Sequence, residues 1–149
     1  MSEPAIPRPE GFTRCYGCGR DNPVGLALVF HREGDAVVAP FIPAPEHGGY
    51  GRLLHGGVTA TLLDEAFGWA SYSLLGKIAM TTDLAITFHA ALRCGEALTV
   101  RGFVERHDER TAAVRGEIRS ATGQLAATGT ATLRFVSRRA VERIGGFAT

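Results

Sequence analysis

The segment 55–76 combines two features that acyl chemistry requires. Gly56 and Gly57 open an apolar run in which Asp64 and Glu65 are the only charged residues. The first amides of a helix have no intrahelical acceptor, and together with the helix dipole they attract negative charge. Glycine at this position lets a substrate carbonyl approach, so these amides could stabilise a developing oxyanion. A carboxylate in an otherwise apolar helix is a candidate catalytic base.

The spacing of these groups constrains how they could work together. Gly56 and Asp64 are separated by about 12 Å along a helix that rises roughly 1.5 Å per residue, so one carbonyl cannot contact both. Two such helices packed antiparallel would bring Gly56 of one chain beside Asp64 of the other, which makes a homo-oligomer a requirement. Glu65 points about 100° away from Asp64 around the helix. We expect Glu65 to pair with an arginine or to face water.

The elements that must position these residues follow from the hydrophobic pattern. Apolar side chains cover nearly the whole circumference of residues 57–76, which predicts a long buried helix. Residues 26–32 and 35–42 predict two strands before it, and alternation of period two predicts four strands from residue 78 onward. Gly102, Gly116 and Gly129 fall at inward positions in the middle of these strands. Because glycine has no Cβ, another segment of backbone could approach the sheet closely there. The sequence therefore predicts an α+β fold with one antiparallel sheet around one helix.

Composition limits the number of domains and the kinds of partner. The chain has 149 residues, 45% of them hydrophobic, and a net charge of +1, which indicates one globular domain without affinity for nucleic acid or a membrane surface. We expect a flexible arm over residues 1–14, a single domain over 15–137 and a tail over 138–149. Three cysteines without an export signal favour reduced thiols and a cytoplasmic location.

Cys15 and Cys18 form a C-x-x-C pair that could indicate a metal or redox site. A structural zinc site needs four ligands, usually from a second such pair, and Cys94 stands alone. A redox pair normally accompanies a βαβ pattern, which is absent. We expect the two cysteines to pack as small apolar residues, and we expect the protein to use neither a metal nor another cofactor.

Several motifs resemble those of the PaaI-like group of hotdog acyl-CoA thioesterases, in the 4-hydroxybenzoyl-CoA thioesterase superfamily. The main one runs from His47 to Ala66 and contains His55-Gly56-Gly57 followed by Asp64. Two flanking segments, Met80–Phe88 and Cys15–Leu26, resemble the strand after the helix and the entry segment of a subgroup. The resemblance spans about residues 15 to 136.

The resemblance implies a hotdog fold, in which a sheet of five to six antiparallel strands wraps one central helix, and hydrolysis of an acyl-CoA thioester. The amide of Gly56, with that of Gly57, would polarise the carbonyl. Asp64 of the partner subunit would activate water or attack the carbonyl directly. Thr81 matches a Ser or Thr that positions water or substrate, and His55 would orient the substrate or cap the helix. The expected assembly is a homodimer or a dimer of dimers.

Two other functions remain open for such a chain. The first is a protein of the same fold that binds acyl-CoA without catalysis. The second is an enoyl-CoA hydratase-type enzyme, since Asp21-Asn22-Pro23 matches part of a hydratase motif. That motif continues to a histidine, whereas this chain continues with Val24. Arg93 and Arg110 are candidates for coenzyme A phosphate contacts, but we expect them to be solvated surface residues.

Overall fold

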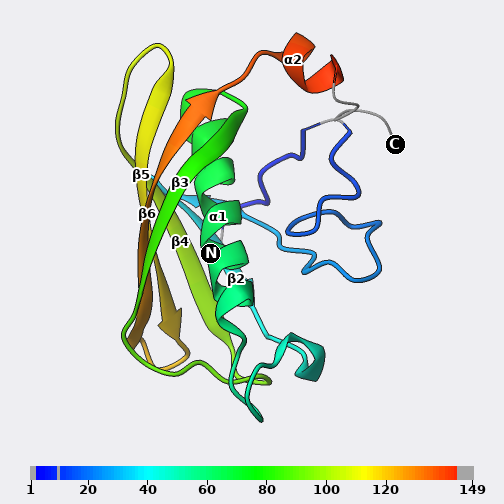
Figure 1. Cartoon of the computed structure of the whole chain (residues 1–149), viewed down its shortest axis with the longest axis vertical. Coiled ribbons are helices and arrows are strands. Elements are labelled where there is room, and N and C mark those ends of the chain that lie inside the picture. Colours follow the sequence, from blue (N-terminus) through cyan, green and yellow to red (C-terminus); the bar gives the residue numbers. More distant parts are fainter. Residues whose placement is uncertain (1–2, 10, 144–149) are drawn as a thin grey trace.

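A single sheet and a single long helix make up most of the molecule in the computed structural model, which describes residues 3–9 and 11–143 (Figure 1). The sheet has six antiparallel strands in the order β1-β2-β4-β5-β6-β3. The strands are β1 His31–Glu33, β2 Ala36–Phe41, β3 Ala79–Phe88, β4 Leu98–His107, β5 Thr111–Ser120 and β6 Leu125–Phe135. The predicted α+β hotdog fold is confirmed.

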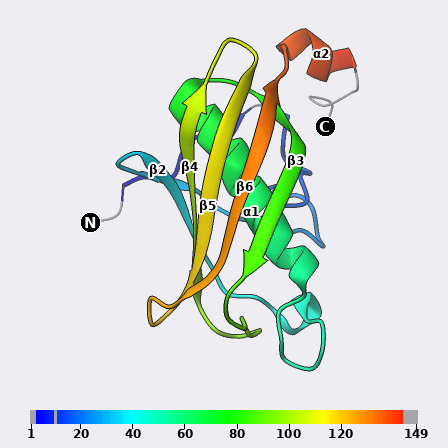
Figure 2. The ribbon, with the colours of Figure 1, turned by 60° about the vertical axis from the view of Figure 1, so that its left-hand side comes forward.

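Helix α1, Gly56–Ala70, crosses one face of this sheet (Figure 2). It continues into a π-helical turn over Ser71–Leu75, which ends at Gly76 in the left-handed conformation. The expected single helix over residues 57–76 is therefore an α-helix with a π-turn at its end. A short 3-10 turn, Pro45–His47, precedes α1, and helix α2, Arg138–Arg143, follows β6. Residues 144–149 of the expected tail lie outside the described residues.

The sheet approaches α1 closely at the three inward glycines. A Cβ at Gly102 would lie 2.7 Å from the carbonyl oxygen of Ala66 in α1, and a Cβ at Gly116 would lie 2.8 Å from the ring of Phe67. At Gly129 it would lie 3.1 Å from Leu63. Glycine is thus needed for the helix to lie against the curved sheet, as the alternation predicted.

The segment before β1 differs from the sequence prediction. A strand was expected over residues 26–32, but the observed strand β1 covers only residues 31–33. Ala27 has a φ of 51°, in the left-handed region, which interrupts an extended strand. Leu26 and Leu28 instead donate backbone hydrogen bonds to Tyr16 and Gly17. Residues 11–30 consequently lie against α1 on the side opposite the sheet (Figure 1).

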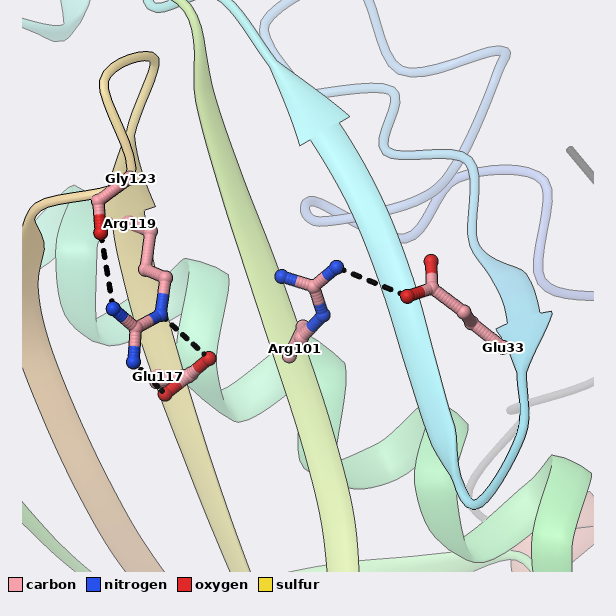
Figure 3. A network of polar contacts seen from close by, with 5 residues as sticks. All are labelled: Glu33, Arg101, Glu117, Arg119 and Gly123. Carbon is pink, nitrogen blue, oxygen red and sulfur yellow. Dashed lines mark hydrogen bonds and ion pairs between the residues drawn. The ribbon is translucent and has the colours of Figure 1, made fainter.

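The outer face of the sheet is polar and holds several of the many arginines. Arg101 pairs with Glu33 at 3.1 Å (Figure 3). Arg119 donates two hydrogen bonds to the carboxylate of Glu117, from Nε at 2.9 Å and from Nη2 at 3.1 Å. Arg115 stacks over the ring of Phe103 at 4.1 Å. Such exposed pairs contribute little stability. They identify the face of the sheet that is turned away from α1.

Candidate active site

The first turn of α1 is capped by the residue that precedes it. The backbone of His55 is extended, with φ −62° and ψ 134°, and its Nδ1 accepts a 2.8 Å hydrogen bond from the amide of Gly57. This is the geometry of an N-cap. The amide of Gly56 forms no hydrogen bond within residues 3–9 and 11–143. Of the two glycine amides expected to bind an oxyanion, Gly56 is therefore the one that is available.

An apolar pocket of about 400 Å³ opens beside Gly56. Its walls come from the loop before α1, the first turn of α1, the end of β3 and the loop that follows β3. The ring of Phe88 forms one wall, because a Cβ on Gly56 would lie 3.5 Å from it. The lining residues are Leu53, Leu54, Gly56, Thr59, Phe88, His89, Ala90, Ala91 and Leu92. This pocket places an unpaired amide next to apolar surface, which suits an acyl carbonyl.

Asp64 lies two turns further along α1 and is held by a residue of β3. The hydroxyl of Thr81 donates a 2.6 Å hydrogen bond to Oδ1 of Asp64. Asp64 is half-buried and Thr81 is exposed in the single chain. The sequence predicted both residues as part of the site, and the structure brings them together. Oδ2 of Asp64 forms no hydrogen bond within the described ranges, so it is free to accept a proton.

A bulge in β3 explains how Thr81 reaches Asp64. The pairing of β3 with β6 shifts register between Thr81 and Asp83, where Thr81 pairs with Leu133 and Asp83 with Thr132. A bulge reverses the alternation of side chains along a strand. Thr81 before it and Ile86 after it consequently both face α1, although they are an odd number of residues apart. No feature of the sequence indicated this bulge.

The two halves of the expected site remain apart within one chain. Gly56 and Asp64 belong to the same unbroken helix, so about 12 Å of helix axis separates them. The pocket beside Gly56 does not include Asp64 or Thr81. His55, Gly56 and Gly57 thus form one group at the start of α1, and Asp64 and Thr81 form a second group at its middle.

Glu65 occupies an environment that the sequence did not predict. It points to the N-terminal segment, where its Oε1 lies 3.3 Å from Sγ of Cys15. No arginine or lysine of the described residues pairs with it, so the predicted ion pair is wrong. The alternative of a side chain facing water is wrong as well, because Glu65 is half-buried against Cys15. Burial raises the pKa of Glu65 to about 8. The sequence does show the C-x-x-C pair and the apolar residues around Glu65, but no pattern in it indicates that these two features lie together in space.

Cys15 and Cys18 share this environment. Both pack against the hydrophobic core, as expected from the sequence. A hydrogen bond with the Cys18 thiol lowers the pKa of Cys15 to about 5, and the same contact raises the pKa of Cys18. Arg93 and Arg110 are both exposed, as expected. Arg93 nevertheless lies at the rim of the Gly56 pocket, because it forms a β-bridge with Leu53, which lines that pocket.

Comparison with known families then assigns the chain. Residues 51–127, more than half of the sequence, match the thioesterase superfamily, and this stretch contains all five candidate site residues. The chain belongs to the thioesterase superfamily. The family assignment agrees with the resemblance carried by the segment His47–Ala66. No curated protein gives a significant match to the sequence.

Solved structures show the same fold for this thioesterase-superfamily chain. A crystal structure of a thioesterase superfamily protein has a TM-score of 0.76 and 26% identity, over 91% of this chain and 70% of that chain. The E. coli PaaI protein from the phenylacetic acid degradation operon has a TM-score of 0.70 and 20% identity, over 75% and 81%. A hypothetical thioesterase protein of Streptococcus pneumoniae, solved with coenzyme A, has a TM-score of 0.68 and 23% identity, over 72% and 84%.

These matches confirm the PaaI-like hotdog fold expected from the sequence. None of the helices among the described residues is long and apolar enough to cross a membrane.

Proposed function

We propose that this protein hydrolyses the thioester bond of an acyl-CoA. The observation that carries the proposal is the carboxylate of Asp64, which the Thr81 hydroxyl holds with one oxygen free to accept a proton. A carboxylate held in this way suits a general base. Membership of the thioesterase superfamily supports the reaction type. The Streptococcus pneumoniae protein solved with coenzyme A supports the substrate class through their common fold.

In the proposed reaction, the amide of Gly56 donates a hydrogen bond to the thioester carbonyl oxygen. Asp64 removes a proton from a water molecule as the water oxygen attacks the carbonyl carbon. The negative charge that develops on the carbonyl oxygen is stabilised by the Gly56 amide and the helix dipole. When the carbon–sulfur bond breaks, Asp64 returns its proton to the leaving thiolate. In the alternative route, an Asp64 oxygen attacks the carbonyl carbon, the carbon–sulfur bond breaks and the coenzyme A thiolate leaves, taking a proton from solvent. Water then hydrolyses the mixed anhydride, which releases the carboxylic acid and restores Asp64.

The proposed site requires two chains, because Gly56 and Asp64 lie too far apart on one helix. An exposed edge of the sheet supports such an assembly. Strand β3 lies at the end of the sheet and has no neighbouring strand on one side in the described part of the chain. Met80, Leu84 and Phe88 along it are 54%, 39% and 58% exposed. An unpaired edge strand with large apolar side chains is a typical surface for association. We propose that a second copy of the chain covers β3 and completes each site, without a metal or other cofactor in the reaction.

Thiol release from a panel of acyl-CoA substrates tests the proposal. The panel includes short and long aliphatic chains and aromatic acyl groups, and free coenzyme A is measured with a thiol reagent. We expect turnover on at least one class, and we expect Asp64→Asn to reduce kcat by about 10²–10⁴-fold, the usual contribution of a general base. Asp35→Asn, in the turn between β1 and β2, is the matched control and should keep the wild-type rate.

Two outcomes would contradict the proposal. Wild-type turnover by a folded Asp64→Asn variant would remove Asp64 from the chemistry. Saturable binding of acyl-CoA with no hydrolysis of any member of the panel would instead assign the chain to the non-catalytic binding class. Hydration of an enoyl-CoA in the same assays would indicate the hydratase-type alternative.

A further inference from the structure

A turn in the N-terminal segment presents two thiols on the side of α1 opposite the sheet. The segment Cys15–Gly19 closes through a 2.8 Å hydrogen bond from the amide of Gly19 to the carbonyl oxygen of Cys15. The amide of Cys18 lies 3.5 Å from Sγ of Cys15 and donates to it. Backbone donors of this kind stabilise negative charge on sulfur, as metal ligation requires. The turn therefore directs both sulfur atoms to one point.

Helix α1 brings a carboxylate to the same point. Oε1 of Glu65 lies 3.3 Å from Sγ of Cys15, and one ligand atom from each of Cys15, Cys18 and Glu65 lies within 4.8 Å of the other two. Gly17, between the two cysteines, makes this approach feasible, because a Cβ there would overlap the side chain of Glu65. The turn is thus built closely around the carboxylate.

We propose that Cys15, Cys18 and Glu65 bind one Zn²⁺ ion. Zinc accepts thiolate and carboxylate ligands in a tetrahedron with bonds of about 2.0–2.3 Å, and such bonds place neighbouring ligand atoms roughly 3.5–4 Å apart. The Cys15–Glu65 separation of 3.3 Å is close to this range, and the other ligand atoms lie within 4.8 Å, so small side-chain rotations would bring all three into a tetrahedron. Sites with three protein ligands keep a fourth position for water or another ligand. Any protons that the two thiols and the Glu65 carboxyl group still carry are released to solvent on binding.

The surroundings leave space for that fourth ligand. A cavity of about 180 Å³ adjoins all three residues. Its remaining walls are mostly apolar and include Phe12, Trp69 and Tyr72. A water molecule needs about 30 Å³ of liquid volume, so the cavity can hold one or a small ligand. No basic residue of the described chain pairs with Glu65, so no side-chain cation competes for this position. Once deprotonated, the two thiols and the carboxyl group carry three negative charges, which a bound divalent cation partly balances.

Cobalt substitution tests the proposal on the whole protein, independently of hydrolysis. Purified, reduced protein is titrated with Co²⁺, and the thiolate-to-cobalt absorption band is followed, with Zn²⁺ displacing the cobalt. We expect one ion per chain. Cys15→Ser and Cys18→Ser should each abolish or strongly shift the band, and Glu65→Gln should weaken binding by more than about tenfold. Cys94→Ser is the matched control, since Cys94 is also buried and outside the cluster, and should bind like the wild type.

A second measurement needs no variant and protects the test against misfolding. Alkylation of the native protein is followed by mass spectrometry with and without Zn²⁺. We expect Zn²⁺ to slow the modification of Cys15 and Cys18 and to leave that of Cys94 unchanged. The proposal is wrong if the wild type takes up no stoichiometric Co²⁺ or Zn²⁺, or if Zn²⁺ leaves all three alkylation rates unchanged. It is equally wrong if metal uptake persists when both cluster cysteines are replaced.

Discussion

The hydroxyl of Thr81 donates a 2.6 Å hydrogen bond to Oδ1 of Asp64, across the contact between β3 and α1. This bond occupies one oxygen of the carboxylate and fixes the direction of the other. In the proposed reaction, Thr81 is thus a positioning residue for the base. Its contribution should appear in kcat, since it orients the group that transfers the proton.

Replacement of Thr81 tests this role. A hydrogen bond to a charged group contributes about 1.5–3 kcal/mol, so Thr81→Ala should lower kcat by roughly 10–100-fold with little change in KM. Thr81→Ser keeps the hydroxyl and should retain most of the activity. Thr82→Ala is the matched control, because the Thr82 hydroxyl donates to the carbonyl of Thr132 at 3.1 Å. Steady-state kinetics would contradict the role if the alanine and serine variants were equally impaired.

The cap at the start of α1 leads to a prediction for stability. Nδ1 of His55 accepts from the amide of Gly57, and loss of an N-cap typically costs about 0.5–2 kcal/mol. His55→Ala should lower the free energy of unfolding in urea by this amount. His55→Asn can accept the same hydrogen bond, so it should keep both the stability and the order of magnitude of kcat. A stable but inactive asparagine variant would show instead that the imidazole contacts the substrate.

Complementation between inactive chains tests the shared site. Gly56 is the first residue of α1, where proline is tolerated, so Gly56→Pro removes the amide donor with little strain on the helix. Gly56→Pro and Asp64→Asn should each be nearly inactive alone. After random exchange of subunits, about half of the dimers are mixed. Each mixed dimer has one site with both Gly56 and Asp64 and one site with neither, so activity should return to about a quarter of wild type.

Subunit exchange must be verified before that result is interpreted, for example by native mass spectrometry of differently tagged chains. Verified mixed dimers that remain inactive, although both variants are folded, would exclude a site built from Gly56 of one chain and Asp64 of the other.

The close contact between sheet and helix yields a prediction that is independent of function. A Cβ at Gly102 would lie 2.7 Å from the backbone oxygen of Ala66. Gly102→Ala should therefore destabilise the protein by about 1–3 kcal/mol, as overpacking usually does. Gly68→Ala is the opposite case, since a Cβ there meets nothing within 4 Å and alanine favours the helix by about 0.8–1.0 kcal/mol. The free energies of unfolding, measured by chemical denaturation, would contradict this close contact if Gly102→Ala were the more stable of the two variants.

Sequence patterns predicted the elements well because periodicity reports which face is buried. The alternation in β4, β5 and β6 and the apolar residues of α1 correctly indicated one sheet around one helix. The close approach at the inward glycines was also predicted, since a glycine at mid-strand often marks a place where another backbone comes near. Gly56, Gly57 and Asp64 were predicted as site residues because their residue types are unusual in an apolar helix.

The parts that escaped prediction depend on contacts between distant segments. The bulge at Thr81–Asp83 is set by how β3 pairs with β6, and no local residue preference marks it. The segment before β1 reads as a strand by alternation, but Ala27 takes a left-handed conformation and the segment bonds to the Cys15–Gly19 turn instead. For the same reason, the sequence could not place Glu65 beside Cys15, because 50 residues separate them in the chain.

The unbroken backbone of α1 between Gly56 and Asp64 has a consequence for how this protein can tolerate change in length. One residue inserted in that stretch would rotate everything after it by about 100° and move it by about 1.5 Å. Asp64 would then leave the hydroxyl of Thr81, and Leu63 and Phe67 would leave the glycine-lined face of the sheet. We therefore expect an insertion or deletion within these two turns of helix to abolish activity, whereas surface loops generally tolerate changes in length.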